Sequence, residues 1–474
     1  MNTNLFDRAI EYFYQLCEIP HGSGDMDKIS RFCTDFAKKQ GLKFIIDNAR
    51  NVIIYKAASK GYEDFEPVIL QGHFDMVCQS VEPFDFSNSG ITVLKDGDFL
   101  TAKGTTLGAD NGIAVAMILA ILESENISHP AIEAVFTTDE EIGMIGASKL
   151  DTSCLKSKLM INLDSEDDGI VTVSCAGGAD FITKLPVKRQ VKKGTLAKIT
   201  ISGLLGGHSG VEIDKGRVNA DILAGRILAC FTHEFRIVSI NGGNKANAIP
   251  NGCVIEVCTE NVTELKKQLD AIADEIKEEM HAREEGLSLS FEVLAQGEFS
   301  TFTNELTKNI VSALILVPNG IIQMSAEING LVETSLNLGI LKTDEELITM
   351  HFALRSNKNS ALFFLRKRLE RFFESFECTT EWGGYYPPWE YNDLSRLREL
   401  YCKTYKEIYG SDPKVEAIHA GLECAVFSSG IKGLDCISIG PQLYDVHTVN
   451  ESMSLSSTRE LMYLLLKILE NCKF

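Results

Sequence analysis

The chain has 474 residues, of which 45% are hydrophobic and 24% charged, an ordinary globular composition that is long for a single hydrophobic core. Its formal net charge of −20 argues against a nucleic acid partner and against anionic membrane surfaces. We therefore expect a soluble protein with two domains.

The cysteines and the N-terminal segment indicate a cytoplasmic protein. The 13 cysteines are scattered and form no Cys-x-x-Cys pair, which favours reduced thiols over a disulfide framework. The segment Met1–Ile19 lacks a basic stretch followed by an apolar core, so we do not expect a signal peptide. The longest apolar stretch, Gly112–Leu122, is too short to cross a bilayer.

The first 180 residues alternate between predicted helices and predicted strands. Apolar residues at helical spacing predict helices at Leu5–Cys17 and Lys28–Gln40, and short apolar runs predict strands at Lys43–Ile46 and Asn51–Tyr55. The long apolar run Asn111–Ser124 predicts another helix. This alternation indicates an α/β fold with a mostly parallel sheet flanked by helices.

Four further apolar runs each precede a residue that can bind metal. They are Pro67–Leu70 before His73, Ala134–Phe136 before Glu140 and Glu141, Leu159–Leu163 before Asp164, and Cys436–Ile439 before His447. Each run is short and bounded by polar residues or glycine, which is typical of a buried strand. Because ligands of open α/β sheets bind beyond the carboxyl ends of the strands, we expect these side chains to lie at one sheet edge.

The middle of the chain differs from the first 180 residues, because none of its predicted strands is followed by a residue of the candidate metal site. It predicts strands interleaved with amphipathic helices at 217–232, 262–284, 304–317 and 360–376, in two successive groups of similar order. After Tyr386 the first pattern returns, with a helix at Leu394–Tyr409. The sequence therefore predicts one discontinuous domain, 1–183 and 386–474, interrupted by an inserted α+β domain, 184–385.

The candidate metal ligands are two imidazoles and three carboxylates: His73, Asp110, Glu141, Asp164 and His447. Such a set suits two metal ions with one bridging carboxylate, and zinc accepts both kinds of ligand. Asp110, at the start of a helix, is the best bridging candidate. Asp75 could orient the His73 ring, and Glu140 is free to act as general base.

Each of these residues also has an ordinary structural interpretation. His73 alone is more often a satisfied, partly buried histidine, Asp110 could only cap its helix, and the acidic run after Asp164 could be a solvated turn. The acidic pair Glu140-Glu141 could similarly be a solvated helix start. The metal hypothesis rests on five candidates that all lie at strand ends or helix starts.

Motifs typical of a known family lie at 70–77, 107–112, 138–143, 162–166, 206–210, 419–424 and 447–451, and together they extend over essentially the whole chain. These segments resemble the M20 family of dizinc metallopeptidases, and within it the cytosolic non-specific (aminoacyl-histidine) dipeptidases. The resemblance implies a zinc-exopeptidase fold whose inserted domain is a lid. It implies hydrolysis of dipeptides with free termini, including Xaa-His dipeptides, by a hydroxide that bridges two Zn²⁺ ions, with Co²⁺ or Mn²⁺ as alternatives.

The resemblance also implies a role for each matching residue. His73 and Asp164 would hold one metal, Glu141 and His447 the other, and Asp110 would bridge them. The catalytic residues would be Asp75, which orients His73; Glu140, the base; and His208, which stabilises the oxyanion. The substrate-binding residues would be Asn247 and Arg355, together with Gly421 and Glu423, whose backbone N–H groups at the start of a helix could bind a carboxylate.

Two alternatives to a dipeptidase stay open at this point. The chain could be another M20 amidohydrolase, such as a tripeptidase or an aminoacylase, because a metal site recognises only the scissile bond. It could also be a metal-loaded protein that binds peptides without cleaving them. The expected partners are small peptides, and a homodimer is left open.

Overall fold

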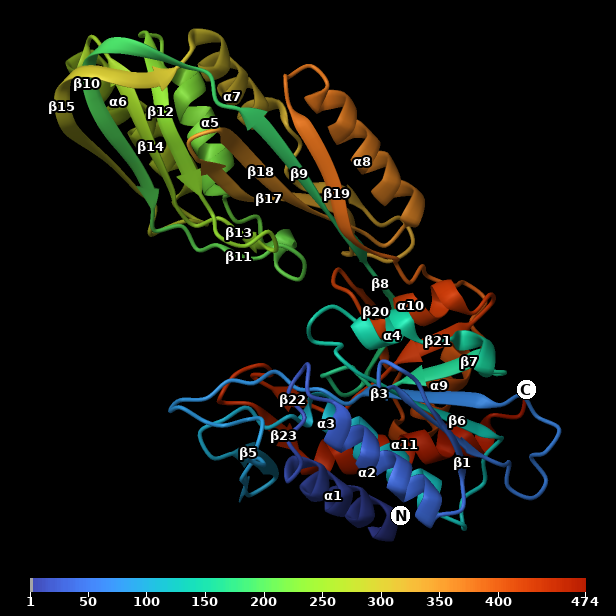
Figure 1. Ribbon diagram of the computed structural model, residues 1–474. Coiled ribbons are helices and arrows are strands. Elements are labelled where there is room, and N and C mark those ends of the chain that lie inside the picture. Colours follow the sequence, from blue (N-terminus) through green and yellow to red (C-terminus); the bar gives the residue numbers. More distant parts are fainter. Residues whose placement is uncertain (1–2) are drawn as a thin grey trace. The chain divides into compact units, whose positions relative to one another are not determined.

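The computed structural model describes residues 3–474, which fold as two compact units (Figure 1). The first unit consists of the chain up to Cys175, together with Trp389–Ala417 and Leu422–Phe474. The second unit consists of Ala176–Pro388 and Ile418–Gly421. The inserted segment thus begins at Ala176 and ends at Pro388, where the sequence predicted residues 184 and 385.

An eight-stranded sheet forms the centre of the first unit, with the strand order β1-β2-β6-β3-β7-β21-β8-β20. Its strands are β1 (Lys43–Ile46), β2 (Val52–Lys56), β3 (Val68–His73), β6 (Ile132–Thr137), β7 (Leu159–Asn162), β8 (Ile170–Cys175), β20 (Lys414–Ile418) and β21 (Asp435–Ser438). The central strands β6, β3, β7 and β21 pair in parallel. Every residue of β3, β6 and β7 is buried, which explains why they appear in the sequence as continuous apolar runs. The predicted mostly parallel sheet is confirmed.

Helices cover this sheet, and a small antiparallel sheet lies beside it. The helices are α1 (Thr3–Cys17), α2 (Asp27–Lys39), α3 (Ala109–Glu123), α4 (Ile145–Lys149), α9 (Arg396–Tyr409), α10 (Glu423–Gly430) and α11 (Leu455–Asn471), with a 3-10 turn at Thr152–Cys154. The small sheet contains β4 (Val93–Asp96), β5 (Phe99–Ala102), β22 (Leu443–Tyr444) and β23 (Ser452–Ser454). No helix of the described residues is long and apolar enough to span a membrane.

Helix α3 carries the candidate ligand Asp110 in its first turn. It packs against β3 and is buried from Asn111 to Leu122, which accounts for a sequence that is apolar on every side. Its first turn departs from helical geometry at Asp110 and Asn111, and the peptide bond between these two residues is cis.

The second unit contains a nine-stranded antiparallel sheet with the main order β15-β10-β14-β12-β17-β18-β9-β19, in which β16 also pairs with β17. Its strands are β9 (Gly177–Pro186), β10 (Arg189–Ser202), β12 (Phe235–Gly242), β14 (Cys253–Thr259), β15 (Ser288–Phe302), β16 (Gly320–Met324), β17 (Val332–Thr343), β18 (Leu347–Ser356) and β19 (Thr379–Tyr386). The strands β11 (Gly207–His208) and β13 (Ala248–Ile249) form a separate pair, and Ile213–Lys215 is a 3-10 turn.

Four helices pack on one face of this sheet. Helices α5 (Ala220–Cys230), α6 (Val262–Met280), α7 (Asn304–Leu316) and α8 (Asn359–Phe373) share one hydrophobic core with the strands. Alternation along β9 and β18 sends Phe181 and Phe352 into this core, whereas Asp180 and Arg355 are half-buried on the opposite face. The predicted α+β character of the insert is confirmed by this arrangement.

Candidate metal centre

Parallel strand pairing brings the candidate ligands to one edge of the first unit's sheet. His73 ends β3, Asp164 follows β7 by two residues, and Glu141 lies on the turn that follows β6. Because β3 lies between β6 and β7 with all three strands parallel, the three ligands emerge on the same side. Asp110 reaches this edge from the start of α3, and His447 reaches it from the loop between β22 and β23.

The two carboxylate oxygens of Asp110 face two different imidazoles. Oδ1 lies 3.2 Å from Nε2 of His73, and Oδ2 lies 3.0 Å from Nε2 of His447. Asp164 Oδ1 lies 3.4 Å from Nε2 of His73, and Glu141 Oε1 lies 3.0 Å from Nε2 of His447. The five side chains therefore form two groups of candidate ligands that share Asp110.

The His73 ring is oriented with one nitrogen free to bind metal. Its Nδ1 lies 3.0 Å from the backbone carbonyl oxygen of Asp75, which can only accept a hydrogen bond, so Nδ1 carries the proton. In the neutral ring the Nε2 lone pair then points toward the carboxylates of Asp110 and Asp164. This lone pair and the carboxylates repel each other. A cation between these atoms would replace the repulsion with attraction.

The ionisation of the cluster shows the same requirement for positive charge. Hydrogen bonds with Asp110 and Glu141 raise the pKa of His447 to about 11. Burial opposes charge on His73, but the nearby Asp164 and Asp110 raise its pKa well above the ordinary value. Burial raises the pKa of Asp164 to about 6. The negative charge of the clustered carboxylates is therefore balanced by protons on the imidazoles. Bound metal ions would take the place of these protons.

The donor atoms also fit a metal by their spacing. One donor atom each from His73, Asp110 and Glu141 lies within 4.8 Å of the other two. Asp164 Oδ1 is buried and accepts no hydrogen bond within the described chain. Imidazole nitrogen and carboxylate oxygen are ligands of Zn²⁺, Co²⁺ and Mn²⁺.

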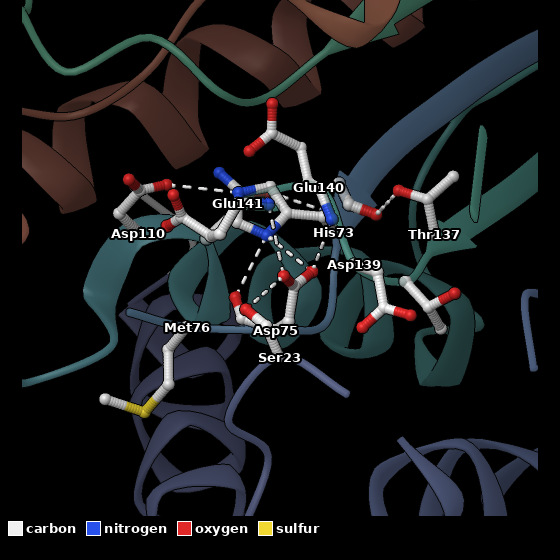
Figure 2. Close-up of polar contacts among 12 residues, drawn as sticks. Ser23, His73, Asp75, Met76, Asp110, Thr137, Asp139, Glu140 and Glu141 are labelled. Carbon is white, nitrogen blue, oxygen red and sulfur yellow. Dashed lines mark hydrogen bonds and ion pairs between the residues drawn. The ribbon is translucent and has the colours of Figure 1, made fainter. Parts of the chain in front are cut away.

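The buried carboxylate of Asp75 connects His73 to the turn that carries Glu140 and Glu141 (Figure 2). It accepts hydrogen bonds from Ser23 Oγ at 2.8 Å, from the Glu140 amide at 2.9 Å and from the Glu141 amide at 3.2 Å. Its Oδ1 also lies 3.5 Å from Nδ1 of His73. One side chain thus fixes both a candidate ligand and the acidic turn, and Ser23 is a partner that the sequence did not predict.

Glu140 lies half-buried on this turn beside the candidate ligands. The preceding residue, Asp139, has a φ of 53° and accepts a hydrogen bond from the Gly24 amide at 2.7 Å. Burial raises the pKa of Glu140 well above the ordinary value; His73 opposes this shift, and Asp164 adds to it. No hydrogen bond of the described residues occupies its carboxylate, which leaves that group available for proton transfer.

Glu451 is a residue of this site that sequence reasoning missed. Its Oε2 accepts hydrogen bonds from the Leu107 and Gly108 amides at 2.7 and 3.1 Å, and its Oε1 accepts from the Ala109 and Asp110 amides at 2.8 and 3.4 Å. It therefore holds the segment that ends in Asp110. In the sequence, only its position four residues after His447, within the segment 447–451, could have indicated that Glu451 belongs to the site.

Glu423, predicted to contact the substrate through its backbone, has a fully buried side chain. Its Oε2 accepts hydrogen bonds from Gln71 Nε2 at 2.5 Å and from Thr137 Oγ1 at 2.6 Å, and burial raises its pKa to about 8. Any substrate contact at this position would therefore involve the backbone. Gly421 lies two residues earlier, just before α10.

In the second unit, His208 is placed beside Arg355. Nδ1 of His208 accepts from the Gly210 and Val211 amides, both at 3.2 Å, so Nε2 carries the ring proton and can donate it. Burial and the charge of Arg355 lower the pKa of His208, which keeps the ring neutral. A Cβ atom at Gly210 would lie 2.9 Å from Cε1 of His208 and 3.1 Å from Nε of Arg355, so glycine permits this close packing.

Asn247 and Arg355 line the same hollow of the second unit, which has a volume of about 290 Å³. Nη1 of Arg355 donates to Tyr386 Oη at 3.0 Å, whereas its buried Nε has no hydrogen-bond acceptor within the described residues. An unsatisfied buried guanidinium donor suits an anionic ligand.

Residues 69–471 match the model of Peptidase family M20/M25/M40. The chain belongs to this peptidase family. It is 34% identical over 468 residues to the cytosol non-specific dipeptidase of Escherichia coli (strain K12), covering 97% of this chain and 96% of that protein. The crystal structure of aminoacylhistidine dipeptidase from Vibrio alginolyticus matches with a TM-score of 0.91 and 34% identity, covering 98% of this chain and 96% of that one.

A tripeptidase from Staphylococcus aureus shares the fold more distantly. Its TM-score is 0.54 at 16% identity, with 99% of this chain and 98% of that chain covered. This likeness concerns the fold alone. The predicted family, its M20 metallopeptidase character and the similarity to cytosolic dipeptidases are confirmed by the two nearer relatives and the family match.

Proposed function

We propose that this protein hydrolyses dipeptides with free termini in the cytoplasm, using two divalent metal ions. The observation that carries the proposal is Asp110, whose two oxygens face His73 on one side and His447 on the other. The names of the relatives from Escherichia coli and Vibrio alginolyticus support the substrate class, and the first name also supports the location.

His73 and Asp164 would hold one metal, Glu141 and His447 the other, and Asp110 both. The pairing of these side chains at 3.0–3.4 Å supports this assignment. When bound, the metals would polarise the scissile carbonyl and make a water molecule acidic enough to attack at neutral pH. We propose Zn²⁺ as the natural ion, since its preferred ligands are present, with Co²⁺ or Mn²⁺ as substitutes in vitro.

Glu140 would move the proton in this reaction. Its carboxylate would take a proton from the attacking water and deliver it to the amine that leaves. The hydrogen bonds of Asp75 to the Glu140 and Glu141 amides would keep this base in a fixed relation to the ligands.

The second unit would supply the groups that recognise and polarise the substrate. The Nε2–H group of His208 would donate a hydrogen bond to the oxyanion that forms on the scissile carbonyl. The unsatisfied Nε–H of Arg355, with Asn247 beside it, would bind the C-terminal carboxylate of the dipeptide. The backbone at Gly421 would offer a further contact.

Replacement of the base tests this mechanism directly. Glu140→Gln keeps the size of the side chain but removes its ability to accept a proton. We expect kcat to fall about 100- to 10,000-fold with the metal content unchanged. Retention of full activity by the metal-loaded variant would contradict the role of Glu140.

A further inference from the structure

The hollow that contains Arg355 also contains an acidic residue, Asp180. Half of the residues that line the hollow are glycine or alanine, so the polar groups of Asn247, Arg355, Tyr386 and Asp180 dominate its chemistry. A volume of about 290 Å³ is near the lower end of small-molecule sites, which suits a single amino-acid residue.

Two glycines permit this arrangement of side chains. A Cβ atom at Gly384 would lie 2.7 Å from Asp180 Oδ2, and a Cβ atom at Gly178 would lie 2.6 Å from the ring of Tyr386. Gly384 also has a φ of 58°, a conformation that other residues rarely adopt. The hollow therefore depends on the absence of side chains at both positions.

Asp180 and Arg355 lie on the same face of the sheet without being each other's partner. In the pairing of β9 with β18, Asp180 is opposite Ala353 and Gly178 is opposite Arg355, so the two charged residues are diagonal neighbours. Diagonal neighbours in antiparallel strands are about 7–8 Å apart. Arg355 donates to Tyr386, and Asp180 Oδ1 lies 3.0 Å from Nε2 of His351.

A hollow with a guanidinium and a separate carboxylate is complementary to a residue that carries both an anionic and a cationic group. We propose that Asp180 selects dipeptides whose C-terminal side chain carries an ammonium or guanidinium group. This inference rests on the proposed function, in which Arg355 binds the C-terminal carboxylate. The side chain of Asp180 is 42% exposed and lines the hollow, which leaves its carboxylate within reach of such a group.

The variant Asp180→Asn tests the inference with dipeptides that differ only at the C-terminal residue. We expect kcat/KM for Ala-Lys and Ala-Arg to fall about 10- to 100-fold, mainly through KM, while Ala-Leu changes less than about threefold. The control is Glu381→Gln, which removes an acidic group that pairs with Lys184 and does not line the hollow. This control should leave the ratios of kcat/KM among the three dipeptides unchanged.

A purely structural role for Asp180 would reduce the hydrolysis of all three dipeptides equally, and this result would overturn the inference. A wild-type protein that cleaves no dipeptide would instead contradict the proposed function. An experiment without any variant covers the case in which Asp180→Asn does not fold. Free L-lysine should inhibit Ala-Leu hydrolysis by the wild-type protein at least about tenfold more strongly than L-norleucine, which lacks the ammonium group; equal inhibition would overturn the inference.

Discussion

The contact between Glu451 and the segment Leu107–Asp110 predicts that a residue outside the ligand set controls metal affinity. Glu451→Gln preserves the size of the side chain but turns one of its two acceptor oxygens into an NH₂ group. Each oxygen accepts from two backbone amides, so the substitution leaves two of the four amides facing a donor. The segment, and the Asp110 carboxylate with it, must then shift.

The structure gives the size of the effect. A buried donor left without an acceptor costs about 1–3 kcal/mol, so two such amides cost at most about 2–6 kcal/mol. Part of this cost falls equally on the metal-free and the metal-bound protein and lowers only the stability of the fold. The remainder opposes the metal-bound position of Asp110, and we expect a 10- to 100-fold loss of metal affinity, the usual effect of losing a group that orients a ligand.

Competition with a chelating dye measures this affinity without relying on catalysis. The matched control is Glu133→Gln, because Glu133 is also buried and accepts hydrogen bonds from the Lys156 and Ser157 amides, close to the opposite end of β6. It should lower the melting temperature while leaving metal affinity within about twofold. Equal metal affinities for Glu451→Gln and wild type would refute the reasoning.

Two further predictions concern the second unit. Burial raises the pKa of Asp221 to about 8, so its contribution to stability is complete below the unfolded pKa near 4 and is lost as the pH rises to about 8. Asp221→Asn should therefore raise the melting temperature at pH 8.5 but not at pH 4.5; equal pH profiles for variant and wild type would show that Asp221 is ionised in the fold. Arg355→Lys should raise KM for dipeptides at least about tenfold with a smaller change in kcat, because lysine cannot bind a carboxylate with two parallel hydrogen bonds; an unchanged KM would remove Arg355 from carboxylate binding.

The predictable part of the fold follows from burial. Strands β3, β6 and β7 are buried on both faces, so they occur in the sequence as short apolar runs, and the residues just after them occupy the sheet edge. Helix α3 was equally recognisable because it is apolar on every side. These local signals were sufficient to predict the parallel sheet and the candidate ligands His73, Glu141 and Asp164.

The remaining features depend on contacts between residues far apart in the chain. The carboxylate of Glu451 meets amides more than 340 residues away, and Ser23 reaches Asp75 across 52 residues. The hollow around Asp180 and Arg355 exists only through the register of β9 with β18. Sequence periodicity carries no information about such pairings, and neither the Glu451 contacts nor the hollow could be predicted.

The central claim is that the ligand set around Asp110 binds two metal ions and that the loaded protein cleaves dipeptides. The most direct test is to titrate metal-free protein with Zn²⁺, determine the bound metal per chain, and follow hydrolysis of Ala-Leu beside Ala-Leu-Ala and N-acetyl-leucine. We predict two ions per chain and cleavage confined to the dipeptide, with activity rising as the second ion binds. A protein that holds two ions but cleaves only the longer or the acylated compound, or none of the three, would contradict the account.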